Sequence, residues 1–469
     1  MQPISIRTLQ PRAEITIHTT RGEVYTYQDL AADAVSLDLQ RATDSSAGSF
    51  SLTLTARAYK DGTWADRIQP MDYVEIRAGN LSPSSYPLGK LPMRFRGFVD
   101  ISTQTFAIGP QGGPQRNVIV SGRDYTKLPM VSQIQYLWTN SLPSALAHAA
   151  TGWGLSYNWG IKNSTTTMRG FVSNVLQHIF EGKGAGAQAE FGASPFLPLF
   201  RQTGVDAPTL IESVTVPDSY AINLYTVQPY TGSLWNLFTY FATPPICESF
   251  IYDAETGPVL VVRIAPFKDL SGKFVSPAID PSTVSTQLGP VSLSTDLIIE
   301  QQIGWSDNEV LNYFFVYSDL AQIGAGSQFS YATPQSIYSP PSSPGGFLSG
   351  ANPTWNAGST ARFGFRPLNL DTPLVSAITT SQNYLQNAVE LAAYLGATQG
   401  HNEQLRSGTI VCHGSEDLIP GRYITVPYSE KTGLSFYLES VSETFLFKGA
   451  QNPSWTAELG VTRGQDVTL

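Results

Sequence analysis

The sequence has little of what disulfide frameworks, metal sites and membrane anchors are made from. It contains 2 cysteines and 5 histidines among 469 residues. Cys247 and Cys412 lie far apart and belong to no C-x-x-C pair, which excludes a disulfide framework and the usual zinc spacings. No apolar run approaches the ~20 residues that span a membrane, and no basic-then-apolar signal segment opens the chain. We therefore expect two buried free thiols, no metal, no cofactor and no membrane anchor.

Charge is also scarce. Asp, Glu, Lys and Arg make up 14% of the chain, well below the usual ~25%. With 28 basic and 37 acidic residues, the net charge is -9, so the chain is a poor candidate for binding phosphate backbones. A thinly charged surface fits a protein that is covered by partners in an assembly.

The residues that are plentiful indicate strands. Hydrophobic residues at 42% are typical of a globular protein, and the length suggests about three domains. Gly (40), Pro (32), Tyr (22) and Phe (23) favour many strands joined by tight turns. Up to about residue 130, apolar and polar residues alternate as they do in half-buried strands. The predicted strands centre on Ile15–Ile17, Val35–Leu39, Phe50–Leu54, Tyr73–Ile76, Phe95–Val99 and Val118–Val120.

The middle of the chain has a different pattern. Apolar residues recur every three or four positions, which predicts helices. These helices cover about 141–152, 171–180 and 234–241. Residues 248–252 and 259–264 predict a hairpin across a turn at 253–257.

The last third mixes loops, one long helix and further strands. The strongest helical pattern covers 376–395, and Gly396 is expected to end it. Ser306 to Glu309 matches a helix capping box. Residues 327–358 are rich in Ser, Pro and Gly and predict a long loop. Further strands are predicted at 297–299, 312–317, 409–411, 422–426, 435–441, 444–447 and 456–461.

The two ends of the chain resemble each other. Each has a proline turn followed by a strand, a strand with an aromatic residue, and a strand that ends near Gly and Arg. The front segments are 70–76, 95–100 and 117–124, and the back segments are 420–426, 436–441 and 456–464. If this repeat is real, the chain holds two small barrels or sandwiches of one kind, separated by a mixed insertion.

No motif identifies catalytic chemistry. Gly182 to Gly186 is glycine-rich, but Lys183 is followed by Gly where a phosphate-binding loop needs Ser or Thr. Cys412 and His413 are neighbours on a predicted strand, where adjacent side chains point to opposite faces. The histidines are scattered and form no metal-binding pattern; they are His18, His148, His178, His401 and His413.

Charged pairs have structural explanations in the sequence. Glu416-Asp417 and Asp307/Glu309 are the nearest carboxylate pairs for glycoside hydrolysis, but a turn and helix capping account for them. Arg123-Asp124 is interpreted as an ion pair that fixes a strand-to-loop corner. We therefore assign no catalytic, cofactor-binding or metal-ligating residue from the sequence.

Several segments together resemble the tailed-phage baseplate hub family. These proteins are adapters between tail tube and central spike and are related to the hub part of type VI secretion spike proteins. The segments are M-D-Y-V-E-I-R with F-R-G-F-V-D, V-S-G-R-D-Y-T-K-L, S-L-W-N-L-F through E-S-F-I-Y-D, G-P-V-L-V-V-R-I-A-P-F, G-W-S-D-N-E-V-L-N-Y-F-F-V, R-F-G-F-R-P, and L-R-S-G-T-I-V-C-H-G-S-E-D-L-I-P-G-R-Y-I-T-V. Singly each is weak, and their order and spacing carry the resemblance. The family has no catalytic signature, so no active-site residue is carried over.

The resemblance implies a fold, an assembly and a location. It implies a mainly β chain with α+β insertions, in which two related small antiparallel β-barrel domains are separated by a mixed middle region. The expected domains are 1–130, the first barrel; 131–290, the α+β middle; and 291–469, the second barrel with an inserted loop and helix at about 325–405. The expected place is the tail baseplate of a virion, assembled in the host cytoplasm.

The resemblance also implies partners. Hub proteins of this kind form a homotrimeric ring, in which six similar barrels face a hexameric tube or tube-initiator ring and the other face receives a trimeric spike. Wedge or tape-measure proteins are further expected contacts, and DNA passes through an acidic lumen without specific binding. Related spike proteins carry hub and spike on one chain; here no spike domain follows the last predicted strand, so a separate spike polypeptide is expected.

Two alternatives to the structural hub stay open. One is a tail-associated peptidoglycan hydrolase, which needs a catalytic pair in a cleft. The other is a carbohydrate- or receptor-binding tail protein, which would gather exposed aromatic side chains into one shallow patch.

Overall fold

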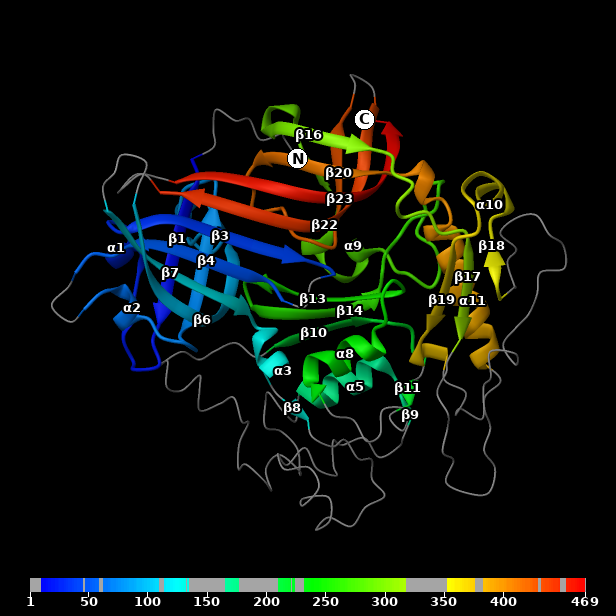
Figure 1. The fold of residues 1–469 in the computed structure, drawn as a ribbon, viewed down its shortest axis with the longest axis horizontal. Helices are drawn as coiled ribbons and strands as arrows, with labels where there is room; N and C mark the ends of the chain where they lie inside the picture. The colour runs from blue at the N-terminus through cyan, green and yellow to red at the C-terminus, as the bar shows by residue number, and fades with distance from the viewer. Residues whose placement is uncertain are drawn as a thin grey trace, which may run out of the picture.

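The computed structural model of the chain is built mainly from strands, which confirms the predicted mainly β class (Figure 1). The described residues are 10–44, 47–58, 62–108, 114–131, 133–134, 165–176, 210–220, 222–223, 232–317, 352–375, 383–428, 432–447 and 453–468. The helices among them are α1 (Tyr27–Leu30), α2 (Trp64–Arg67), α3 (Lys127–Val131), α5 (Met168–Val175), α8 (Leu234–Phe241), α9 (Pro281–Val284), α10 (Ala357–Phe363) and α11 (Asn383–Gln399).

One curved sheet of 13 described strands runs through both ends of the chain (Figure 1). Its order is β16 (Ile298–Gly304), β20 (Arg406–His413), β23 (Ser454–Thr468), β22 (Thr432–Leu446), β3 (Ala34–Ala42), β4 (Ser49–Thr55), β7 (Pro114–Asp124), β6 (Met93–Ile108), β5 (Tyr73–Gly79), β1 (Arg12–His18) and β2 (Val24–Tyr25). Off this path, β21 (Tyr423–Pro427) pairs with β22 and with β15 (Val291–Ser292). The two barrel-like halves are thus joined through β22 and β3, a junction that the sequence did not predict, and the domain boundaries stay predictions.

The first half of the sheet follows the alternation seen in the sequence. The apolar residues of β4 are buried and its Ser and Thr residues are half-buried. Val35, which was expected on the buried face, is exposed. The reason is a bulge in β3 between Ala34 and Ser36, which places one extra residue outside the regular pairing.

The second half has the same strand order as the first. In the first half β5 pairs with β6, β6 with β7, β7 with β4, and β4 with β3. In the second half β21 pairs with β22, β22 with β23, β23 with β20, and β20 with β16. Segments 435–441 and 444–447, predicted as separate strands, lie in a single long strand, β22, that continues through two bulges. The repeat predicted from the sequence is therefore confirmed as a repeat of strand pairing.

The turns that begin both halves also match. Met71 and Gly421 each follow a proline, and both have positive φ, 73° and 85°. The N–H of Met71 donates to the carbonyl of Val99 at 2.8 Å, and that of Gly421 donates to Leu438 at 2.8 Å. A proline followed by a residue with positive φ is the geometry of a type II turn. Glycine adopts it without strain, whereas methionine in the first half does not.

Bulges occur at the same places in the two halves. In β6 the register shifts between Val99 and Ile101, and in β22 it shifts between Leu438 and Ser440. The bulge of β3 recurs in β16, where the register shifts between Ile298 and Glu300. Phe98 on β6 therefore corresponds to Tyr437 on β22. Phe98 pairs with Tyr73, the first residue of β5, and Tyr437 pairs with Tyr423, the first residue of β21. The sequence match of 95–100 with 436–441 is therefore wrong by two residues.

A buried carboxylate holds the junction between the halves. Glu443 on β22 is 1% exposed and accepts hydrogen bonds from three side chains, each on a different strand of the large sheet. Arg94 Nη2 on β6 lies 2.8 Å away and Arg41 Nη2 on β3 lies 3.0 Å away. The indole Nε1 of Trp455 on β23 donates at 3.1 Å. The charges of both arginines are thus partly compensated by a single carboxylate in the interior.

The middle region packs a small sheet against helices. β10 (Ile211–Thr215), β14 (Gly257–Ile264) and β13 (Cys247–Ala254) form this sheet, and β13 and β14 confirm the predicted hairpin. Two strand pairs complete the described region: β8 (Gln133–Ile134) with β12 (Gly232–Ser233), and β9 (Thr165–Thr166) with β11 (Ile222–Asn223). Helices α5 and α8 confirm two predictions, each capped by a hydroxyl group at its first turn. The helix predicted at 141–152 lies outside the described residues.

The hairpin contacts both halves of the large sheet. The carboxylate of Asp253 accepts from the backbone N–H of Arg96 at 3.0 Å, and Glu255 accepts from the N–H of Met93 at 2.7 Å. From its other strand, Arg263 Nη2 donates to the carbonyl of Gly421 at 2.5 Å. The hairpin therefore fixes the first half relative to the second.

A second insertion lies between β16 and β20. It contains β17 (Tyr313–Tyr317), β18 (Thr354–Trp355), β19 (Pro367–Asp371), α10 and α11. The capping-box prediction at Ser306 is wrong: its hydroxyl accepts from Asn308 in a turn, and no helix follows. Gly396 does not end α11, which continues to Gln399, since an internal glycine costs a helix only about 1 kcal/mol. Residues 327–351 of the predicted long loop lie outside the described residues.

Replacing Glu443 by alanine should strongly destabilise the protein. The change leaves Arg41 and Arg94 buried without their carboxylate, which typically costs about 3–5 kcal/mol. Urea unfolding followed by circular dichroism measures the free energy of unfolding. The matched control is Glu458→Ala on the exposed side of β23, expected within about 0.5 kcal/mol of wild type. Equal losses in the two variants would contradict the role given to Glu443.

Gly421→Ala should destabilise the protein more than Gly22→Ala. Both glycines have positive φ, 85° and 87°, so each substitution brings conformational strain of about 1–2 kcal/mol. A β-carbon at Gly421 would also lie 2.6 Å from the Phe250 ring and 2.8 Å from Arg263, whereas none lies within 4 Å at Gly22. We expect about 2–4 kcal/mol lost for Gly421→Ala in the same assay. A loss no greater than that of Gly22→Ala would show that the close contact relaxes freely.

Candidate functional site

The large sheet presents one face that is covered with small polar side chains. Because side chains alternate along a strand, this polar face is opposite to the apolar cores of the two halves. Across four neighbouring strands, Thr444, Asp38, Ser51 and Ser121 lie side by side in one row. Its other residues include Gln302, Thr409, Glu458, Ser442, Gln40, Thr53 and Thr103.

Negative charge predominates on the polar face. Asp38, Glu300 and Glu458 are exposed there. Arg123 lies on the same face, but its charge is paired with Asp100 through contacts of 2.7 and 3.1 Å. Hydroxyl groups and unpaired carboxylates offer phosphate no attraction, so the polar face suits a surface that nucleic acid passes without binding.

The polar face ends at two strand edges. Along β6, pairing with β5 stops at Phe98, and from Ile101 onward this strand pairs, within the described part of the chain, with β7 alone. At the other end of the sheet, β16 pairs with β20 alone among the described strands. Both edges carry exposed apolar side chains: Ile101 (50%) and Phe106 (64%) on β6, and Ile299 (53%) on β16 with Trp305 (63%) just after it. Exposed edges of this kind are natural sites for pairing with another strand.

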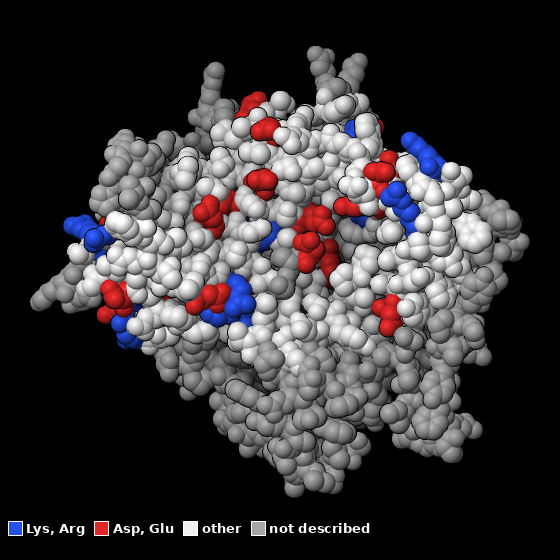
Figure 2. Space-filling model, viewed as in Figure 1, with Lys and Arg blue, Asp and Glu red and all other residues white. Residues whose placement is uncertain are grey.

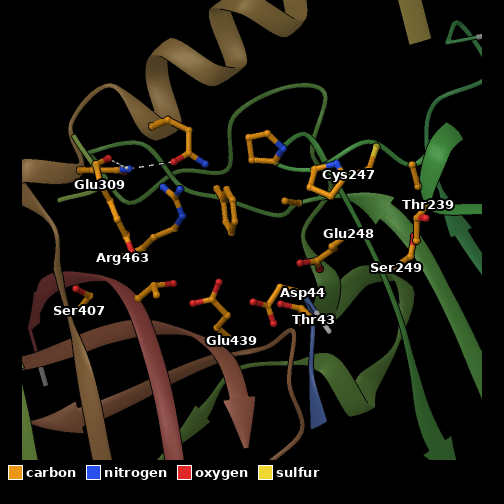
Figure 3. A pocket seen from close by; sticks show the side chains of 18 of the residues that line it. Thr43, Asp44, Thr239, Cys247, Glu248, Ser249, Glu309, Ser407, Glu439 and Arg463 are labelled. Atoms are coloured by element: carbon orange, nitrogen blue, oxygen red, sulfur yellow. Dashed lines mark hydrogen bonds between the residues drawn. The ribbon is translucent and has the colours of Figure 1, made fainter. Parts of the chain in front are cut away.

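A cavity of about 740 Å³ opens beside the junction of the two halves. Acidic side chains gather next to a hollow near the middle of the view in Figure 2. Its lining combines apolar walls with carboxylates and includes Asp44, Trp235, Glu248, Phe267, Glu309, Glu439 and Arg463. Figure 3 shows the side chains of Asp44, Glu248 and Glu439 pointing toward one another.

The acidic groups of the cavity differ in their environment. Burial, and then the nearby charges of Asp44 and Glu309, raise the pKa of Glu439. Glu248 is instead neutralised by Arg263, whose Nε lies 2.5 Å away, and accepts from the hydroxyl of Tyr437 at 2.5 Å. A carboxyl with a raised pKa beside a second carboxyl group is one requirement of glycoside hydrolysis, so the hydrolase alternative has a location in this structure.

The internal repeat gives the same cavity a structural explanation. Glu439 is the extra residue of the bulge in β22, and Asp100 is the extra residue of the matching bulge in β6. Asp100 pairs there with Arg123 and with Lys127, whose Nζ lies 2.9 Å away. An acidic bulge residue is thus a feature of both halves. Among the described residues, only Glu439 borders the cavity of about 740 Å³.

The structure corrects the interpretation of Arg123 and Asp124. They do not pair with each other, since neighbours on a strand point to opposite faces. Arg123 pairs with Asp100, whereas buried Asp124 accepts from the backbone N–H of Gly48 at 2.8 Å and of Thr126 at 2.9 Å. Burial, only partly offset by these hydrogen bonds, raises the pKa of Asp124 to about 7.

The other carboxylate candidates from the sequence have structural roles. Glu416 accepts from the hydroxyl of Tyr86 at 3.1 Å and from the amide of Asn80 at 3.4 Å, and so ties a loop of the first half to the second. Asp307 lies 3.7 Å from Arg366, and Glu309 borders the cavity. Sequence reasoning missed Asp44 and Glu439 because the fold brings them together from opposite ends of the chain.

Thiols and imidazoles do not form a joint site in the described part of the chain. Cys247 and Cys412 are free and buried as expected, and burial raises the pKa of both thiols. His18 and His401 are half-buried on separate elements, and burial lowers the pKa of each imidazole. His148, His178 and residues 182–186 lie outside the described residues. Within the described ranges, no three His, Cys, Asp or Glu side chains are placed to hold a metal ion, and no helix has the length and apolarity needed to cross a membrane.

Comparison with known proteins gives likenesses to solved structures, among them two tail proteins and a PdpA-VgrG complex. No family model and no curated protein matches the chain. The 43 kDa tail protein of prophage MuSo2 from Shewanella oneidensis is 11% identical, with a TM-score of 0.46 over 97% of this chain and 98% of its own. The tail protein from Neisseria meningitidis MC58 is 13% identical, with a TM-score of 0.45 over 96% of both chains. The Francisella PdpA-VgrG complex is 9% identical, with a TM-score of 0.43 over 98% of this chain and 59% of the other. At TM-scores below 0.5 these likenesses support no conclusion about this chain.

Asp124→Asn should flatten the dependence of stability on pH. The folded state holds the Asp124 proton more tightly than the unfolded chain, whose ordinary pKa is 3.8. The free energy of unfolding of wild type should therefore fall as pH rises from about 4 to 7, by at most about 1.4 kcal/mol per pH unit from this group. Urea unfolding at several pH values measures the slope, with exposed Asp38→Asn as control. An unchanged slope in Asp124→Asn would show that this carboxyl does not carry the effect.

Proposed function

We propose that the chain is a structural hub protein of a bacteriophage tail, without enzymatic activity. One observation carries the proposal: the same four-strand unit, β3-β4-β7-β6 and β16-β20-β23-β22, occurs twice and is joined side by side in one curved sheet. A chain that offers two equivalent units can meet a ring with twice as many subunits as there are copies of the chain. The resemblance of the sequence to baseplate hubs supports the same assembly.

In this assembly three copies form a homotrimeric ring with six similar units. The six units match a hexameric tail tube or tube-initiator ring, and the three-fold arrangement of the remaining parts matches a trimeric central spike. Wedge or tape-measure proteins are further partners. The assembly belongs to the virion, in the tail baseplate, and forms in the host cytoplasm.

The polar face of the sheet forms the lumen of the ring. Its hydroxyl groups and its carboxylates Asp38, Glu300 and Glu458 keep DNA from adhering as it is ejected. The apolar cores of the two halves then lie on the outer side of this wall.

Each of the two alternative functions is favoured by one observation. The carboxylates Asp44 and Glu439 at the cavity favour a peptidoglycan hydrolase. Trp305 and Tyr428, which both stack on Arg406 at 4.9 and 5.0 Å, favour a glycan-binding surface. The hub is preferred because it accounts for the duplication of the whole strand unit, which neither a catalytic pair nor an aromatic patch requires.

Light scattering after gel filtration tests the hub directly. Three copies of the 50.9 kDa chain give about 153 kDa, and we expect this mass for the purified protein. The trimer should also bind a recombinant spike chain. A monomer that fails to trimerise with its spike chain would contradict the hub. Clearing of a cell-wall suspension by wild type but not by Glu439→Gln would then support the hydrolase instead.

A further inference from the structure

The junction between β22 and β3 occurs once in the chain, although each of these two strands has a counterpart in the other half. The counterpart of β22 is β6, and the counterpart of β3 is β16. These two counterparts are the strands whose outer edges are unpaired in the described part of the chain. We infer that β6 of one copy pairs antiparallel with β16 of the next, which repeats the β22–β3 junction between chains. The inference rests on the proposed ring and names the surface that closes it.

The register follows from the internal junction. There, Ser440 lies opposite Ala42 and Thr444 lies opposite Asp38. The matched bulges make Ile101 the counterpart of Ser440 and Thr105 that of Thr444, while Gln302 is the counterpart of Asp38. Thr105 of one copy therefore lies opposite Gln302 of the next.

Exposure at the β6 edge is explained by this pairing. Phe445 on β22 is fully buried, because it packs into the core of the first half across the junction. Its counterpart Phe106 on β6 is 64% exposed. In the ring, Phe106 would enter the core of the second half of the next copy, beside Ile298 and Ile303 of β16, which are partly buried against that core. An apolar side chain that is exposed in one place and buried at its counterpart indicates a missing neighbour.

The β16 edge shows the same contrast. Leu37 and Leu39 on β3 are buried beneath β22, whereas their counterparts on β16 are Gln301, which is exposed, and Ile303, which is partly buried. Trp305 stands where Arg41 stands in the first half. Pairing with β6 would cover this edge and give each backbone N–H and C=O along it a partner.

The two junctions differ in charge. Glu443, which binds two arginines inside the chain, has Gln104 as its counterpart, and the position of Arg41 is taken by Trp305. The junction between chains therefore buries no ion pair. Apolar and hydrogen-bonded contacts suit surfaces that must be stable in water before the chains meet, since a charge buried only on assembly would first lose its hydration. Two different edges also form a head-to-tail contact, the kind that closes into a ring.

A disulfide cross-link tests the pairing and its register. Thr444 and Asp38 lie at a position without backbone hydrogen bonds between them, because Thr43 N–H donates to Glu439 and Phe447 N–H donates to Val35. Such pairs have the shorter Cα separation, which a disulfide can bridge. The double variant Thr105→Cys/Gln302→Cys should therefore give, after oxidation, a covalent ladder up to three chains on a non-reducing gel.

The control moves the cysteines out of register. In Thr103→Cys/Glu300→Cys, the two positions are displaced by four residues, about 13 Å along the strand, and should not cross-link. Two outcomes would overturn the edge pairing and leave the proposed hub standing, provided that light scattering shows a trimer. In one, the control cross-links as well as the test pair; in the other, neither pair cross-links. A chain that stays monomeric and gives no cross-link would overturn both.

A second variant tests the edge without cysteines. Phe106→Glu should abolish the trimer and leave the melting temperature of the monomer unchanged, because the side chain is exposed in the single chain. Leu88→Glu, equally exposed at 64% but in the loop between β5 and β6 and not on either edge strand, should leave the trimer intact. A trimer that persists in Phe106→Glu contradicts the placement of this residue in the contact.

Discussion

The pairing of β22 with β3 is the contact on which the rest of the structure depends. It joins strands from opposite ends of the chain, and Glu443 fixes it by binding Arg41 and Arg94 at once. Burying three charged groups is costly, and the cost is offset only when the carboxylate meets both cations in good geometry. The two halves are therefore held in one relative position, which is what gives the sheet a continuous face and two defined edges.

Duplication explains features that look unrelated along the chain. The positive φ of Met71 has no local cause, but Gly421 shows that the turn itself requires it. The acidic residues Asp100 and Glu439 are both extra residues of one bulge. Asp100 pairs with Arg123 and Lys127, whereas Glu439 borders the cavity of about 740 Å³. Each half has thus kept the backbone geometry while its side chains diverged, which is why the repeat is faint in the sequence.

The middle hairpin adds a second constraint. Asp253 and Glu255 accept backbone N–H groups of β6, while Arg263 donates to the turn at Gly421. The hairpin therefore braces the two halves against each other, and it leaves the edges of β6 and β16 uncovered. An insertion that braces the halves without capping their edges is compatible with a ring in which those edges meet other copies.

Local pattern in the sequence determined the strands, the hairpin, two described helices and the matching turns, because alternation, helical periodicity and proline turns are properties of neighbouring residues. It also excluded disulfides, since two cysteines so far apart carry no framework. Only the tertiary structure decided the partner of Arg123, the exposure of Val35 and the meeting of Asp44 with Glu439. The same holds for the joining of the halves through Glu443. These depend on bulges and on contacts between residues hundreds of positions apart, and a single sequence gives no measure of which distant residues meet.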